Sequence, residues 1–153
     1  GLGDVYKRRG TFRGNNHAFV TATATLEHYW RTPAFADSVV AKGEHLRARL
    51  QTLVDLHEPH LVGVPGRGMM RGLRCTDPKL AAGVTKRAFQ HGLVIERCGP
   101  EDEVIKCMMP LTTSVEELDE GIDILARSLV EEIGRAGRGP TVVHSRRGLE
   151  VST

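Results

Sequence analysis

Apolar residues recur every three to four positions in four stretches of the chain, which is the pattern of an amphipathic helix. We expect helices over residues 16–30, 34–56, 78–91 and 115–133. The second and fourth stretches predict the longest buried stripes, formed by Phe35, Val39, Leu46, Leu50, Leu53 and Val54, and by Leu118, Ile122, Leu125, Leu129 and Ile133.

Residues typical of helix ends stand at these boundaries. Asp77 followed by Pro78 predicts a cap with proline at the first helical position, and Gly92 predicts a left-handed residue at the helix end. Ser114 and Glu117 have the spacing of a capping box at the start of the fourth helix.

Short runs rich in apolar residues, bounded by Gly and Pro, predict four strands at residues 61–64, 69–75, 93–97 and 104–108. We expect residues 65–68 to form a hairpin turn between the first two strands, and residues 98–102 to form the turn between the last two. The order of elements predicts an α+β fold, in which helices cover one face of a small, mainly antiparallel sheet.

Composition excludes several classes of protein. The chain has 153 residues, of which 40% are hydrophobic and 26% charged, as in one ordinary globular domain. A net charge of +2 does not favour nucleic acid as a partner. No apolar run is long enough to span a bilayer, so we expect no membrane association and a cytoplasmic protein.

The cysteines Cys75, Cys98 and Cys107 lie far apart and lack metal-ligand spacing, so we expect reduced thiols. The histidines also lack such spacing, and His57 and His60 have no carboxylate or Cys partner in the pattern. We therefore expect no metal site.

The segment from Gly10 to Asn16 places a hydroxyl, two glycines and a capping Asn within seven residues, directly before a helix. Backbone N–H groups at a helix start suit an anion such as phosphate. A Gly-Thr turn before an Asn cap is also common at the start of a helix that binds no ligand. This segment alone therefore leaves both interpretations open, an anion site and a purely structural helix start.

Three motifs together resemble the C-terminal part of class III (fold type I) pyridoxal-phosphate (PLP) aminotransferases. They are Gly-Thr-Phe-Arg-Gly-Asn-Asn-His-Ala-Phe from residue 10, Gly-Arg-Gly-Met-Met-Arg-Gly-Leu from residue 66, and Val-Ile-Lys-Cys-Met-Met-Pro-Leu-Thr from residue 104 with the acidic segment 116–121. The resemblance covers residues 10–132 and is nearest to the diaminobutyrate–2-oxoglutarate aminotransferases of ectoine biosynthesis.

The resemblance implies roles for particular residues. Thr11 and Phe12 would bind the phosphate of PLP held by the partner subunit of a homodimer. Lys106 stands where many class III enzymes carry an Arg that binds a substrate carboxylate; Lys offers a flexible point charge instead of a planar fork. For Arg67 and Arg71 we favour ion pairing at the surface or at an interface over substrate contact.

The family's Schiff-base lysine precedes the Gly-Thr-Phe segment, and none of Lys7, Lys42, Lys79, Lys86 and Lys106 has its Ser-Lys context. We therefore expect a fragment that is inactive alone. Its expected parts are a phosphate loop and large-domain remnant at residues 1–15, a small domain with its leading helices at 16–133, and a disordered tail at 134–153.

The reaction that the resemblance implies moves an amino group between diaminobutyrate or aspartate semialdehyde and glutamate or 2-oxoglutarate. Two alternatives stay open: another ω-aminotransferase, acting on ornithine, 4-aminobutyrate or acetylornithine, and a non-enzymatic α+β module that binds an anion.

Overall fold

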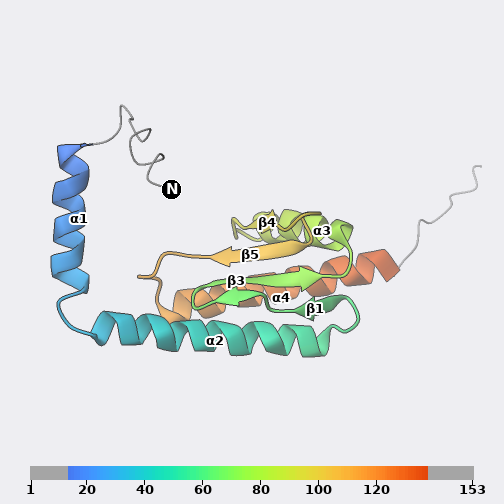
Figure 1. Ribbon diagram of the computed structural model, residues 1–153. Helices are drawn as coiled ribbons and strands as arrows, with labels where there is room; N and C mark the ends of the chain where they lie inside the picture. The colour runs from blue at the N-terminus through green and yellow to red at the C-terminus, as the bar shows by residue number, and fades with distance from the viewer. Residues whose placement is uncertain (1–13, 138–153) are drawn as a thin grey trace, which may run out of the picture. The chain divides into compact units, whose positions relative to one another are not determined.

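Helices and strands occur in the expected order in the computed structural model, which describes residues 14–137 (Figure 1). The helices are α1 (Asn16–Tyr29), α2 (Ala34–Leu56), α3 (Pro78–Gln90) and α4 (Val115–Gly137). The strands are β1 (Leu61–Gly63), β2 (Gly66–Arg67), β3 (Met70–Cys75), β4 (Glu96–Cys98) and β5 (Val104–Met108). The chain divides between Ala41 and Lys42 into two compact units, which are described separately.

The first unit contains α1 and the start of α2. Asn15 caps α1, because its side-chain oxygen accepts from the backbone N–H groups of His17 and Ala18 at 3.0 and 3.3 Å. At the other end, the ring of Phe35 lies 4.8 Å from that of Tyr29 and 5.2 Å from that of Trp30. These ring contacts join α1 to the first turn of α2.

The second unit is built on one antiparallel sheet with the strand order β1-β3-β5-β4, and β2 pairs with β3. Leu73 of β3 and Ile105 of β5 are register partners, and both side chains are fully buried. Figure 1 shows α3, α4 and the later turns of α2 gathered along this sheet. The α+β fold predicted from the sequence is confirmed.

The second half of α2 supplies buried leucines and approaches the hairpin closely. Leu46, Leu50, Leu53 and Val54 are buried as expected, whereas Phe35 and Val39 are only half-buried. A Cβ at Gly43 would lie 2.8 Å from the Cα of Gly68, so only a glycine lets the helix contact this turn.

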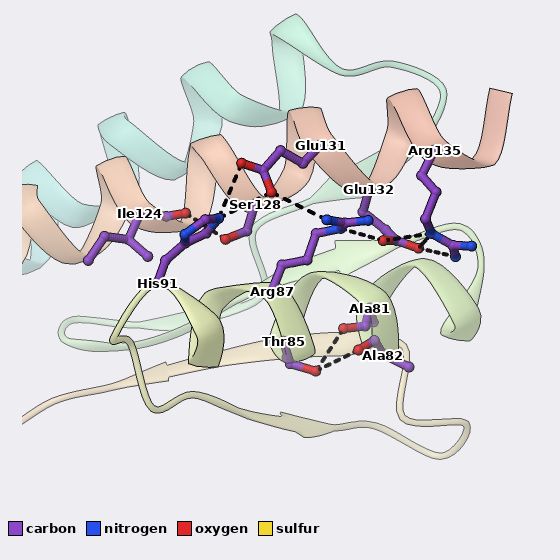
Figure 2. Close-up of polar contacts among 10 residues, drawn as sticks. All are labelled: Ala81, Ala82, Thr85, Arg87, His91, Ile124, Ser128, Glu131, Glu132 and Arg135. Atoms are coloured by element: carbon purple, nitrogen blue, oxygen red, sulfur yellow. Dashed lines mark hydrogen bonds and ion pairs between the residues drawn. The ribbon is translucent and has the colours of Figure 1, made fainter. Parts of the chain in front are cut away.

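An ion-pair network fastens α3 to α4 (Figure 2). Glu132 is buried, and its carboxylate accepts from the Nε of Arg87 at 2.6 Å and from the guanidinium of Arg135. Glu131 accepts from Arg87 and pairs with the ring of His91 at 3.1 Å. The charge of a buried carboxylate is thereby matched on two sides.

The position predicted for the first hairpin turn is wrong. Residues 66 and 67 form strand β2, paired with β3, so the turn lies at Gly68 and Met69. Gly68 has a φ of 55°, the left-handed conformation that a two-residue hairpin turn needs. Met69 is only 4% exposed, so this apolar residue is buried although it belongs to the turn and not to a strand.

Two other boundaries also differ from the sequence prediction. The strand expected at residues 93–97 is β4, which begins at Glu96, because the N–H of Leu93 donates to Ala88 at 2.8 Å and completes the end of α3. The fourth helix continues to Gly137, beyond the expected end at Ile133. The pair between Arg135 and Glu132, three residues apart, contributes to this extension.

Candidate functional site

Lys106 lies on the central strand β5 and forms an ion pair with Glu96 of β4. The two residues are register partners, so their side chains share one face of the sheet. Lys106 Nζ and Glu96 Oε2 are 2.6 Å apart. The Lys106 side chain is 29% exposed and that of Glu96 is 72% exposed, so Glu96 is the more accessible member.

The other neighbour of Lys106 across the sheet is Gly72 of β3, which has no side chain. A Cβ at this glycine would lie 2.4 Å from the side chain of Val104 and 3.1 Å from the carbonyl oxygen of Ile105. Lys106 therefore has the acidic side chain of Glu96 on one side, whereas on the other side the Val104 side chain fills the space over Gly72.

Each member of the pair changes the protonation of the other. The hydrogen bond from Lys106, followed by its charge, lowers the pKa of Glu96. The same contact with Glu96 raises the pKa of Lys106. At neutral pH the site therefore presents one positive and one negative charge in contact.

Both side chains also line a cavity of about 410 Å³ between the end of β5, residues 93–96 and the first half of α4. Most of its wall is apolar, with Leu93, Ile95 and Ile122 among the lining residues. This combination of an apolar wall and a few charged groups is typical of small-molecule sites.

Lys42 reaches the same region and binds two backbone carbonyl groups there. Its Nζ donates to the carbonyl oxygens of Leu111 at 2.6 Å and Thr113 at 2.9 Å. It thereby ties α2 to the loop between β5 and α4, and Ser114 and Glu117 form the expected capping box just beyond.

Arg71 forms an ion pair, as expected, but within the fold and together with hydrogen bonds to the backbone. Its guanidinium donates to the carbonyl oxygens of Gly68 and Gly66 and lies 3.5 Å from Glu44. Its side chain is 9% exposed, so it supports the hairpin from inside. Arg67 is exposed on β2.

Thr11 and Phe12 lie outside the described residues, so their assignment to a phosphate site stays a prediction. The helix that follows them begins at Asn16, as expected. However, the N–H groups of His17 and Ala18 already donate to Asn15, so these two groups are satisfied without an anion. A phosphate would depend on donors earlier in the segment.

Other candidate chemistry is sparse in residues 14–137. No cluster of three or more His, Cys, Asp or Glu side chains that could hold a metal ion occurs there. Cys75, Cys98 and Cys107 are free thiols. Within the same residues, no helix is both long and apolar enough to cross a membrane.

Sequence reasoning missed Glu96, the partner of Lys106. The predicted turn at residues 98–102 was one residue too early, because counting outward from it matches residue 97 with 103 and 96 with 104. The observed register matches residue 98 with 104, 97 with 105 and 96 with 106. Glu96 and Lys106 can therefore be recognised as a charged pair on one face of the sheet only when the strand register is known.

The sequence of this chain matches the family Aminotransferase class-III over residues 3–129, so the chain belongs to that family. It is 46% identical over 129 residues to the diaminobutyrate–2-oxoglutarate transaminase of Streptomyces coelicolor and 42% identical over 125 residues to that of Vibrio cholerae. Each match covers 82% of this chain and 30% of the relative. An uncharacterised aminotransferase of Sinorhizobium fredii is 45% identical over 133 residues, 85% of this chain and 30% of that protein.

Solved structures share the fold. A lysine aminotransferase from M. tuberculosis aligns with a TM-score of 0.63 and 21% identity, covering 71% of this chain and 24% of that one. A phospholyase from Arthrobacter aligns with a TM-score of 0.64 and 22% identity, covering 72% of this chain and 27% of that one. The chain thus spans about 30% of the length of the curated relatives that it matches.

Class III aminotransferases are PLP-dependent enzymes. The residue type at position 11 suits one part of that cofactor, because threonine has a hydroxyl and a backbone N–H, the kinds of donor that bind a phosphate.

Proposed function

We propose that this chain is the C-terminal part of a PLP-dependent aminotransferase that acts on L-2,4-diaminobutyrate. In the whole enzyme, an amino group would move between diaminobutyrate or aspartate semialdehyde and glutamate or 2-oxoglutarate, as in ectoine biosynthesis. The observation that carries this proposal is the 42–46% identity to transaminases of that name across most of the chain.

Each assigned residue would have one task. Thr11 and Phe12 would hold the phosphate of PLP from across a homodimer interface. Lys106 would attract a substrate carboxylate by charge, and the apolar cavity beside it would accommodate the carbon chain and exclude water. When bound, PLP supplies the electron sink for moving the amino group.

The chain alone is proposed to be inactive, because the Schiff-base lysine of the family would lie in the larger part of the enzyme. We also propose that the whole protein is a cytoplasmic homodimer. Purified chain should therefore give no amino transfer with PLP, diaminobutyrate and 2-oxoglutarate. Turnover by the chain alone would contradict this part of the proposal.

The decisive experiment uses the enzyme encoded by the complete reading frame, purified with PLP. We expect it to form glutamate from 2-oxoglutarate with 2,4-diaminobutyrate as donor, and to prefer this donor to ornithine, 4-aminobutyrate and acetylornithine. A preference for one of the last three would identify a different ω-aminotransferase and overturn the substrate assignment.

The phosphate assignment is tested in the same enzyme by Thr11→Val. We expect weaker retention of PLP, roughly tenfold or more, because a charge-assisted hydrogen bond is lost. Thr25→Val is a matched control, since the Thr25 hydroxyl donates to the carbonyl oxygen of Thr21 at 2.8 Å within α1. Equal PLP retention by both variants and the wild type would exclude a phosphate role for Thr11.

A further inference from the structure

The charge on Lys106 is paired before any substrate arrives. Glu96 Oε2 lies 2.6 Å from Lys106 Nζ, and the Glu96 side chain is 72% exposed. An exposed cross-strand ion pair of this kind contributes little to stability. Stabilisation of the fold is therefore a weak reason for this ion pair to stand at the wall of a cavity, and a role in binding is the alternative.

The arrangement offers two opposite charges to a ligand at once. Lys106 and Glu96 both line the cavity of about 410 Å³, next to apolar wall residues such as Ile95. The other register partner of Lys106 is Gly72, over which the apolar Val104 side chain lies, so this neighbour brings no second charge to the pair. A ligand that carries an anion and a cation on neighbouring atoms matches such a surface.

We propose, on the basis of the function proposed above, that Glu96 determines substrate specificity by binding the α-ammonium group of diaminobutyrate. Lys106 binds the carboxylate on the same carbon, and the γ-amino group is left free to react. A substrate with the carboxylate but without the α-ammonium leaves two carboxylates, its own and that of Glu96, to share the single positive charge of Lys106.

This charge-pair recognition differs from two simpler roles for Glu96. If Glu96 only masked Lys106, its removal would improve binding of every carboxylate substrate alike. If it only stabilised the sheet, its removal would leave the choice between substrates unchanged. Charge-pair recognition instead predicts effects of opposite sign on two substrates that differ only in the α-ammonium.

The test uses the PLP-loaded enzyme from the complete reading frame, with 2,4-diaminobutyrate and 4-aminobutyrate as donors. Both carry the reactive amine at the same distance from the carboxylate, and only the first has the α-ammonium. Glu96→Gln should lower kcat/KM for diaminobutyrate by roughly tenfold, mainly through KM, and raise it for 4-aminobutyrate. Lys106→Gln should lower kcat/KM for both donors, because both carry the carboxylate.

Glu101→Gln is the matched control, because it removes the same charge from an exposed residue in the neighbouring turn. We expect its preference between the two donors to equal that of the wild type. A parallel change for both donors in Glu96→Gln, or no change, would overturn the proposal.

A binding measurement separates this inference from the proposed function. Calorimetric titration of the enzyme without PLP should show that L-2-aminobutyrate binds more tightly than butyrate, and that Glu96→Gln abolishes the difference. If the wild type proves inactive with diaminobutyrate, the proposed function fails, and this titration still decides the role of Glu96. Equal binding of the two ligands by the wild type would refute it.

Discussion

Gly83 of α3 lies directly against the carboxylate of Glu132 in α4. A Cβ built on Gly83 would stand 2.4 Å from both Cδ and Oε1 of Glu132, far inside contact distance. The glycine therefore creates the space in which a buried carboxylate receives Arg87 and Arg135. The packing of the two helices and the placement of the ion pairs depend on each other.

Gly83→Ala is expected to destabilise the chain although alanine is the better helix former. The added methyl group must displace Glu132 from its partners, and overpacking of this kind costs about 1–3 kcal/mol. Gly121→Ala in α4 is the control: its nearest neighbour would be a Leu93 methyl at an ordinary 3.8 Å. That control should be stabilised by about 0.5–1 kcal/mol.

The measurement is the free energy of unfolding of both variants by urea titration. Opposite signs for the two substitutions are the expected result. Stabilisation of both by similar amounts would mean that helix propensity outweighs the contact with Glu132.

Acid should weaken the fold partly through Glu132. The hydrogen bond from Arg135, followed by that from Arg87, lowers the pKa of Glu132 from 4.5 against the opposing effect of burial. A carboxyl whose pKa is lower in the folded state stabilises the fold above its unfolded pKa, and this contribution is lost as pH falls through the folded pKa. The loss should therefore begin near pH 4.5 and continue below it.

Glu132→Gln removes this titration. We expect the variant to be less stable than the wild type at pH 7, because Arg87 and Arg135 lose their anion. Between about pH 5 and pH 3, its free energy of unfolding should fall less steeply. The slope is reduced and not abolished, because the pKa of Glu131 is also lowered, chiefly by its hydrogen bond with His91. Identical slopes would show that Glu132 does not contribute.

Much of the fold could be predicted because its signals are local. Asp77, Ser114 and Glu117 mark helix starts through contacts with residues two or three positions away, and these contacts occur as expected. The apolar stripe over residues 46–54 also identified the buried face of α2. Periodicity and capping need no knowledge of the rest of the chain.

The sequence predictions were wrong or incomplete where the structure depends on a residue that is distant in the sequence. The hairpin turn lies at Gly68 and Met69, and not at residues 65–68, because Gly66 pairs with Arg71 in β3. No local sequence pattern indicates this pairing. For the same reason, the resemblance pointed to Lys106 but not to Glu96, whose role depends on strand register. The assignments of Thr11 and Phe12 come from resemblance alone and remain predictions.

Alkylation should distinguish the three thiols of the folded chain. Burial raises the pKa of Cys107 to about 12, and burial together with the charge of Asp77 raises that of Cys75 to about 12. At pH 8 both would carry almost no thiolate, the reactive form, and both are buried. Cys98 is partly accessible at the end of β4.

Iodoacetamide at pH 8 should therefore modify Cys98 first, with Cys75 and Cys107 reacting only when the chain unfolds. Peptide mass spectrometry over a time course measures the three rates, and Cys98→Ser should remove the fast phase without changing the other two. In denaturant the three thiols should be alkylated at similar rates, because unfolding exposes Cys75 and Cys107 as well. Fast labelling of Cys107 under native conditions would contradict the packing of β5 between β3 and β4.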